Sequence, residues 1–329
     1  MSAHRPQLKA YRARRVLVLG ASGFIGSWAA RRLAELQAQL FFAGRDLEAL
    51  AAVCETHEFR ATLHQADFSR PGALSDLFRQ AQPHITFNLA GYGVDPTERD
   101  PDLAAALNTR LVAEIAAAVA ASPASSWRGA QIVHAGSAAE YGPVAEAVSE
   151  NSPCHPVSLY GRTKLAGTQE LLAAQHTGLR AVVARLFTVY GPGEHPGRLL
   201  PSLLAATQSG QPLQLTAGLQ RRDFTYVGDV AEGLVRLGCL ESSGPLLVNL
   251  ATSTLTSVRE FAESAADVLG MKKSQLQFAA LPLRSDEAQQ GPADITRLQQ
   301  LLGWRPAVSI RKGIRLTQAF ATHLQGVKA

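Results

Sequence analysis

Residues 15–26 read RVLVLGASGFIG and pass from an apolar run, through a turn with three glycines, into an amphipathic segment. The apolar residues 16–19 predict a short strand buried on both faces, as in a parallel sheet. Gly20 permits a tight turn, Gly23 lets the backbone approach a phosphate, and Gly26 lets the next helix lie close to the strand. The N-terminus of that helix offers free N–H groups to an anion. This stretch therefore predicts a dinucleotide-binding turn.

The composition is that of a globular protein, with 46% hydrophobic and 18% charged residues. A chain of 329 residues is long enough to bury a sizeable core, in one large domain or two small ones. Much of the net charge of +5 comes from basic residues within the first fifteen positions. We expect residues 1–14 to form a disordered basic leader rather than a nucleic-acid-binding tail, because the cluster stops where the first strand begins.

The chain carries no apolar secretory segment near its start, and we expect no later run to be long enough to span a bilayer. A cytoplasmic protein without membrane or nucleic-acid partners is therefore expected. The three cysteines, Cys54, Cys154 and Cys239, are far apart and form no Cys-x-x-Cys pair. We expect reduced thiols and no metal site.

A second strand is predicted over 39–43, followed by Gly44-Arg45-Asp46 and a helix over 47–55. In dinucleotide folds the end of this strand faces the adenosine ribose, where an arginine suits a 2′-phosphate. Arg45 therefore favours NADP(H), with NAD(H) as the alternative. Asp46 stands where the N-cap of the next helix is expected, which explains it without a cofactor.

Further strands and helices alternate along the chain. One strand is predicted to end with residues 64–68, and others are predicted over 85–91, 131–135 and 246–250. Helices are predicted over 74–81, 100–121 and 258–269. Asp67, at the end of the third strand, is either a contact to the adenine edge or a plain loop aspartate. The alternation, with no repeat, predicts an α/β fold with a doubly wound parallel (Rossmann) sheet.

Candidate catalytic residues lie at the carboxyl end of the fifth strand and on the next helix. Ser137 follows the strand, at the edge where ligands bind in open α/β sheets. Tyr160 and Lys164 are four residues apart and project from one face of a helix that is expected to run to about Gln175. A nearby ammonium favours phenolate, so we expect Lys164 to lower the Tyr160 pKa from its reference of about 10. The alternative is that both are surface residues of an amphipathic helix.

The chain resembles the extended short-chain dehydrogenases/reductases, and within them the nucleotide-sugar epimerases, dehydratases and 4-keto-reductases. The resemblance covers nearly the whole chain. The motifs that carry it are Gly20-Ala-Ser-Gly-Phe-Ile-Gly26, Gly136-Ser-Ala-Ala-Glu-Tyr-Gly142, Tyr160-x-x-x-Lys164, Arg185-Leu-Phe-Thr-Val-Tyr-Gly-Pro-Gly193, Arg221-Arg-Asp-Phe-Thr-Tyr-Val-Gly-Asp229 and Leu302-Gly-Trp-Arg-Pro306.

The resemblance implies roles for individual residues. Ser137 and Tyr160 would hydrogen-bond the reacting oxygen, with Tyr160 as proton donor, and Lys164 would hold the nicotinamide ribose and tune Tyr160. Arg222 would grip the diphosphate of the substrate. Further substrate contacts are expected at Glu140, for which a structural role is equally open, and at Arg198 and Arg284. The residues expected to hold the dinucleotide are Gly20, Ser22, Gly23, Phe24, Ile25, Gly26, Arg45, Asp67, Phe68, Leu89, Ala90, Gly91, Tyr160, Lys164, Thr188 and Val189.

Two parts are expected. Residues 15–190, with returns at about 224–252, would form the dinucleotide-binding domain, and residues 191–223 and 253–329 a smaller C-terminal substrate-binding lobe across a cleft. The resemblance also suggests a homodimer, in which the apolar helices around 103–119 and 158–172 pair with a second copy. The protein's own helices can equally cover them.

Two departures from the family pattern narrow the function. Many relatives have asparagine at the position of Thr188. Dehydratases carry an Asp-Glu pair at the positions of Ala138 and Ala139, so the resemblance argues against a 4,6-dehydratase. We expect NADPH-dependent reduction of the 4-keto group of a nucleotide-linked 4-keto-6-deoxy sugar. The alternatives are an NAD-dependent nucleotide-sugar 4-epimerase, a reductase of a ketone without a nucleotide, and a cofactor-sensing regulator that would be expected to have lost Tyr160 or Lys164.

Overall fold

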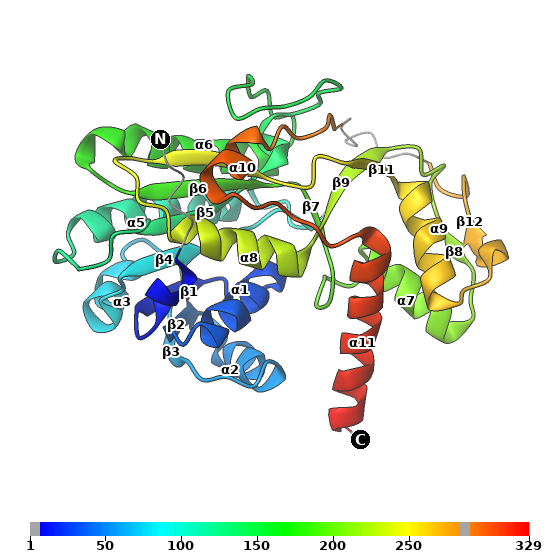
Figure 1. The fold of residues 1–329 in the computed structure, drawn as a ribbon, viewed down its shortest axis with the longest axis horizontal. Helices are drawn as coiled ribbons and strands as arrows, with labels where there is room; N and C mark the ends of the chain where they lie inside the picture. The colour runs from blue at the N-terminus through cyan, green and yellow to red at the C-terminus, as the bar shows by residue number, and fades with distance from the viewer. Residues whose placement is uncertain (1–6, 96, 283–289, 329) are drawn as a thin grey trace.

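The computed structural model describes residues 7–95, 97–282 and 290–328 and is built around a seven-stranded sheet (Figure 1). The strands, in spatial order, are β10 (Leu246–Leu250), β6 (Ala181–Leu186), β5 (Ile132–Ser137), β4 (Ile85–Asn88), β1 (Arg15–Leu19), β2 (Gln39–Gly44) and β3 (Thr62–Gln65). All neighbours pair in parallel. The predicted doubly wound parallel sheet is confirmed. Its strand order reverses between β1 and β4, which is where such sheets bind dinucleotides.

Helices cover both faces of the sheet, and alternate residues of β1 show the division. Val16 and Val18 join a core cluster with helices α1 (Phe24–Glu35) and α8 (Val227–Gly238). Leu17 and Leu19 join a second cluster on the opposite face, which the helices α3 (Leu74–Ala81), α5 (Leu111–Ala120) and α6 (Leu159–Ala173) share. Helix α2 (Leu47–Thr56) follows β2. This burial on both faces explains the continuous apolar run in β1.

Strand β6 was missed at the sequence level. All six of its positions are buried, and it lies between β5 and β10. Its sequence is Ala-Val-Val-Ala-Arg-Leu, in which Arg185 interrupts the apolar run. A short run of this kind cannot be assigned by periodicity alone.

The helix predicted over 100–121 is divided into α4 (Pro101–Ala105), a π-helical turn (Ala106–Arg110) and α5. By length and composition Pro101–Ala120 is apolar enough to cross a membrane, with a mean hydropathy of 1.5 in its most apolar window, so the expectation that no run is long enough was wrong. One such helix is weak support for a membrane span, because core helices of water-soluble proteins pass the same test. This one packs against α3 and α6.

The basic leader is partly folded. Residues Leu8–Tyr11 form a 3-10 turn, and the fully buried Tyr11 donates a hydrogen bond to the Val235 carbonyl oxygen at 2.9 Å. Its ring lies 5.2 Å from that of Trp127. The expectation of a disordered leader is therefore wrong for residues 7–14, because an aromatic anchor stands within the basic stretch. Residues 1–6 lie outside the described part of the chain.

The smaller lobe lies beyond the end of the large sheet, at the right of Figure 1. One small sheet holds β7 (Thr188–Tyr190), β9 (Arg221–Tyr226) and β11 (Leu255–Ser257), and another holds β8 (Leu213–Gln214) and β12 (Leu276–Gln277). Its helices are α7 (Leu199–Ser209) and α9 (Val258–Leu269), while α10 (Thr296–Leu302) packs against β10.

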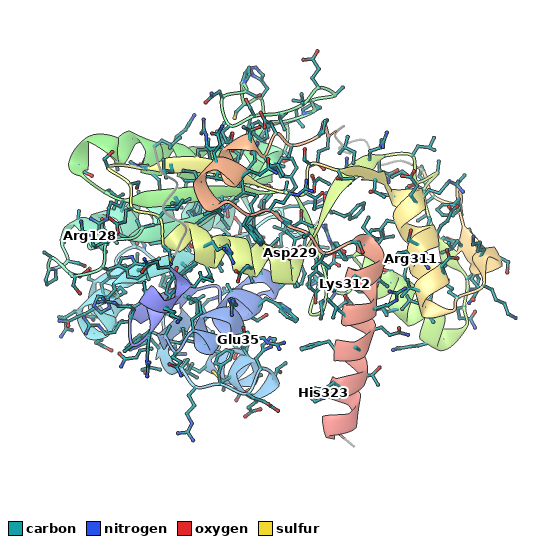
Figure 2. The ribbon with its side chains drawn as sticks, in the orientation of Figure 1. Glu35, Arg128, Asp229, Arg311, Lys312 and His323 are labelled. Atoms are coloured by element: carbon teal, nitrogen blue, oxygen red, sulfur yellow. The ribbon has the colours of Figure 1, made fainter. Side chains whose placement is uncertain are left out.

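The C-terminal helix α11 (Ile310–Lys328) packs with its first turns beside the lobe and then runs away from it, as the red helix in Figure 1. The segment before α11 is fixed by Asp229 of α8, which is labelled in Figure 2. One carboxylate oxygen of Asp229 accepts the N–H groups of Ala307 and Val308 at 2.8 and 2.7 Å. The lobe is thereby tied back to a helix of the large sheet.

Candidate active site

The glycine turn after β1 is shaped by its lack of side chains. Gly20 has a φ of 80°, and a Cβ there would lie 2.6 Å from the backbone of Leu89 and Ala90. The turn therefore packs directly on two residues that the sequence assigned to the same cofactor. A Cβ at Gly26 would overlap the Gly20 carbonyl oxygen, so α1 can begin this close to β1 only with glycine at that position.

The N-terminus of α1 can receive an anion. Gly23 is its N-cap, and no described side chain caps it. Ser22 and Gly23 are exposed, while Phe24 and Ile25 are half-buried. Because free N–H groups and the helix dipole both favour negative charge, these residues fit the pyrophosphate of a dinucleotide. The turn that the sequence identified first would hold that group.

The adenosine end of the site is formed by the segments that follow β2 and β3. Arg45 is exposed directly after β2, and Asp46 caps α2 by accepting the Ala49 N–H at 2.9 Å, which confirms the N-cap interpretation. Asp67 accepts the N–H and hydroxyl of Ser69 at 3.0 and 2.7 Å, and these bonds lower the pKa of Asp67. The Arg70 guanidinium lies 3.4 Å from Asp67. A second arginine, which the sequence analysis missed, thus stands at this end.

The other residues assigned to the cofactor follow β3 or β4 or lie in β7. Phe68 is buried beside Asp67, and Gly91 approaches the Asn108 amide, which a Cβ there would meet at 3.3 Å. Thr188 of β7 pairs with Phe224 of β9, and its neighbour Val189 is buried.

The catalytic candidates occupy the end of β5 and the first turns of α6. Ser158 caps α6 by accepting the Gly161 N–H at 3.0 Å. Tyr160 and Lys164 follow within the first two turns, and the ammonium of Lys164 is buried, with 3% of the residue exposed. Ser137, at the end of β5, is a hydrogen-bond partner of the Tyr160 phenol. The structure therefore brings the three predicted residues together.

The predicted pKa shift of Tyr160 is wrong in direction. Burial raises the pKa of Tyr160 to about 12, although the hydrogen bond from Ser137 opposes this rise. Burial also lowers the pKa of Lys164 to about 8. For Tyr160 the cost of desolvating the phenolate exceeds the opposing effects of the Ser137 hydrogen bond and of the Arg198 charge. The phenol is therefore a protonated donor at neutral pH.

A loop covers Tyr160 from the β4 side. A Cβ at Gly93 would lie 3.4 Å from the Tyr160 Cβ, and the Gly93 N–H donates to Glu98 at 2.7 Å. Asn108, in the π-helical turn, accepts the Tyr92 N–H at 3.0 Å and donates to the Thr163 hydroxyl at 2.9 Å. The π turn thus fixes the loop against α6. Its position gave no signal in the sequence.

Glu140 is held by groups within the protein. Its side chain is fully buried, and its two oxygens accept the Ser137 N–H and the Arg185 Nε–H, each at 2.8 Å. These contacts favour the structural role of Glu140 over a contact with substrate. The next residues towards Ser137 are Ala138 and Ala139, so no carboxylate follows the serine at the positions that a dehydratase uses.

The arginines assigned to substrate lie in different settings. The charge of Arg198, at the start of α7, lowers the Tyr160 pKa, and its guanidinium lies 3.5 Å from Glu194. Arg222 is half-buried in β9, and its guanidinium donates to the Arg221 carbonyl oxygen at 3.1 Å. Arg284 lies outside the described residues. Among the described residues, Arg198 is an arginine whose charge acts on Tyr160.

The profile of the NAD dependent epimerase/dehydratase family matches residues 16–245. A dTDP-6-deoxy-L-talose 4-dehydrogenase (NAD(P)(+)) from Kitasatospora kifunensis is 30% identical over 315 residues, which span 92% of this chain and 93% of that protein. A UDP-glucose 4-epimerase from Mycolicibacterium smegmatis is 29% identical over 325 residues, which span 93% and 98% of the two chains.

Solved structures show the same architecture. The structure of MoeE5 in complex with UDP-glucose and NAD superposes with a TM-score of 0.81 at 27% identity and covers 94% of this chain and 99% of that one. The structure of MoeE5 with UDP-glucuronic acid and NAD superposes with a TM-score of 0.80 at 26% identity and has the same coverage.

Proposed function

Since the chain belongs to the NAD-dependent epimerase/dehydratase family of extended short-chain dehydrogenases/reductases, we propose that it reduces the 4-keto group of a nucleotide-linked 4-keto-6-deoxy sugar with NADPH. The observation that carries this proposal is the grouping of Ser137, Tyr160 and Lys164 with a protonated phenol, and with alanine at 138 and 139. Similarity to a 4-dehydrogenase of a dTDP-6-deoxy sugar supports C4 as the reacting carbon and a nucleotide-linked 6-deoxy sugar as the substrate class.

The protein's own residues would handle the proton and the oxygen. A bound nicotinamide supplies the hydride. The Ser137 hydroxyl would hydrogen-bond the carbonyl oxygen while the Tyr160 phenol, with its pKa of about 12, donates a proton to it. The Lys164 ammonium would stabilise the phenolate that remains.

Binding would use groups remote from the reacting carbon. The glycine turn would hold the pyrophosphate of the cofactor, and Arg45 its 2′-phosphate. Arg222, with Arg198, would hold the diphosphate of the substrate, because a guanidinium matches phosphate oxygens. Binding energy of this kind raises the rate when it orients the carbonyl for reaction.

The second candidate is a nucleotide-sugar 4-epimerase, which would use the same three residues to oxidise and then reduce C4. Similarity to a UDP-glucose 4-epimerase over 93% of the chain favours it. Arg45 favours the reductase, since a reductase draws NADPH from solution whereas an epimerase of this type retains NAD.

Titration of the purified protein with NADPH and NADH, together with analysis of any nucleotide that copurifies, separates the two. The proposal expects tighter binding of NADPH to a protein purified without nucleotide. NAD that copurifies and exchanges slowly would make the epimerase the leading function.

We also propose that the protein is a cytoplasmic homodimer. Only 39% of the most apolar window of Pro101–Ala120 is buried within one chain, which leaves an apolar surface beside α6 for a second copy. Light scattering coupled to size exclusion tests this assembly, and a monomer at micromolar concentration would contradict it.

A further inference from the structure

A buried ion pair lies directly behind Ser137. The carboxylate of Glu140 and the guanidinium of Arg185 are 2.8 Å apart, and their side chains are 0% and 3% exposed. The other carboxylate oxygen accepts the Ser137 N–H at 2.8 Å, and the Ser137 hydroxyl accepts the Ala139 N–H, so Ser137 and Glu140 form a capping box. The residue that would meet the reacting oxygen is thus held from behind by a charged group.

The pair is anchored at its far end. The Arg185 guanidinium lies 4.4 Å from the centre of the Tyr141 ring and 3.1 Å from the Cys154 sulfur. The Tyr141 hydroxyl donates to the Asn249 side chain of β10 at 2.6 Å. Ser137 is therefore connected through side chains to β6 and β10, and not only through its own strand.

The charge of Glu140 also acts on α6, because the 3-10 turn Ala138–Glu140 packs against this helix and both Glu140 and Lys164 are buried there. It opposes the effect of burial on Lys164, where a buried ammonium would otherwise lose its proton more readily, and it raises the pKa of Tyr160. The titratable groups that interact with the carboxylate are Lys164 and Tyr160 of α6, Arg185 of β6, and Cys154, and Lys164 in turn acts on His134 of β5. Arg185 is the one that neutralises Glu140 directly.

Stability alone does not explain such a pair. Removing two charges from water costs as much as their attraction returns, and apolar residues of similar volume often serve as well or better. A functional effect on the neighbouring Ser137 and Lys164 would explain why Glu140 and Arg185 are charged.

We propose that Glu140 is a positioning residue of the active site: its hydrogen bond fixes Ser137 and its carboxylate is the counter-charge of the buried Lys164 ammonium, while Arg185 holds the carboxylate in place. The role of Ser137 in this inference rests on the proposed function. The effect on Lys164 does not, because it concerns the binding of the cofactor.

Two double variants test the proposal without leaving a buried charge unpaired. Glu140→Gln with Arg185→Met removes both charges and keeps an oxygen that can accept the Ser137 N–H. Glu140→Leu with Arg185→Met removes that acceptor as well. The matched control is Glu232→Gln, which breaks the 2.6 Å pair with Arg32 between α8 and α1, on the opposite face of the sheet from α6.

The first readout is cofactor affinity as a function of pH, measured by calorimetry with NADPH. In the natural protein the affinity should fall as pH rises through the Lys164 pKa of about 8. Both double variants should move this fall to lower pH, because Glu140, and not Arg185, is the charged group that opposes the effect of burial on Lys164. The control should keep the natural profile.

The second readout is turnover. The Leu-containing variant should show about a tenfold lower kcat than the Gln-containing one at similar KM, since it alone loses the bond that orients Ser137. Folded double variants with the natural pH profile and equal kcat values would overturn the proposal, even if their melting temperatures fell. A natural protein that binds cofactor but reduces no 4-keto sugar would overturn the proposed function, while the pH profiles would still decide the role of Glu140.

Discussion

The glycine turn and the surroundings of Ser137 are built in different ways. The turn is determined by residues 20–26 and by backbone geometry, and Leu89 and Ala90, which follow β4, pack directly on Gly20. The surroundings of Ser137 depend on side chains from distant segments, such as Arg185, which lies 45 residues from Glu140 in the sequence. The comparison teaches that a local pattern can reveal where an anion binds, whereas the charge states of catalytic groups are set by burial and long-range contacts.

The largest effect is expected on the catalytic side of this comparison. Tyr160→Phe removes the proton donor and should lower kcat by about 10²- to 10⁴-fold, because a positioned general acid contributes that much. Steady-state kinetics and NADPH titration check this, with cofactor affinity nearly unchanged.

The control for Tyr160→Phe is Tyr92→Phe, in the loop over the site. Its hydroxyl accepts only a long bond, 3.3 Å, from the Asp100 N–H. Activity of Tyr160→Phe equal to that of Tyr92→Phe would remove Tyr160 from the mechanism.

The turn itself should respond through its backbone. Gly20→Ala meets a φ of 80° and an overlap with Leu89 and Ala90, and should lower the free energy of unfolding by about 2 kcal/mol or more. Gly23→Ala has a φ of −80° and one close neighbour at 3.2 Å, so it should remain folded and lose cofactor affinity instead. Urea unfolding of both variants measures the difference, and equal destabilisation would contradict the geometry.

Glu194 lies beside the glycine turn, since it lines a cavity of about 570 Å³ together with Ser22 and Gly23. Burial raises the pKa of Glu194 to about 7 from 4.5. The folded protein then binds this proton more tightly than the unfolded chain, so the contribution of Glu194 to stability is fully present below about pH 4.5 and is lost as pH rises through about 7.

Glu194→Gln should flatten this dependence and gain about 1–3 kcal/mol relative to the natural protein at high pH. Urea unfolding of both proteins at low and high pH measures it. Parallel pH profiles for the two proteins would show that the carboxyl is not raised by burial.

A smaller effect is expected at Arg45. Arg45→Ala should reduce the preference for NADPH over NADH by about tenfold, the loss of one solvent-exposed phosphate contact. Separate titrations with the two cofactors measure the ratio. An unchanged ratio would mean that another group, such as Arg70, recognises the 2′-phosphate.

The smallest effect is expected far from both regions. Arg128, labelled in Figure 2, pairs with Glu241 at 3.3 Å, and the two side chains are 81% and 58% exposed. Arg128→Ala should change the free energy of unfolding by no more than about 0.5 kcal/mol, since exposed pairs are screened by water. A larger loss in thermal unfolding would mean that surface charges matter more than burial in this protein.

Much of the fold could be predicted because it follows from the local spacing of apolar residues along the sequence. The strand at 16–19, the N-cap at Asp46 and the alternation of strands and helices each depend on neighbouring residues. Strand β6 escaped because Arg185 breaks its apolar run, and the charge is tolerated there only because Glu140 receives it. The folded part of the leader could not be predicted, because Tyr11 is buried by contacts with residues far away in the sequence, such as Trp127 and Val235.

The sequence predicted which residues form the catalytic group, but it did not predict their pKa values. Spacing places Tyr160 and Lys164 on one face of a helix, but it carries no information about desolvation, which decides the pKa of each. The same limit applies to Glu140. Its place in a family motif suggested a contact with substrate, and only the structure shows that its side chain is buried. Asn108 depends on a π-helical turn that no residue pattern announced.

The central claim, net reduction at C4, is tested most directly by following a deuterium label. The protein would be incubated with nicotinamide-deuterated NADPH and a dTDP-linked 4-keto-6-deoxyhexose, and the product analysed by NMR and mass spectrometry. The account predicts one deuterium at C4 of the sugar and one oxidised cofactor for each product molecule. Recovery of the 4-keto sugar, unlabelled at C4 and without oxidation of the cofactor, would contradict it.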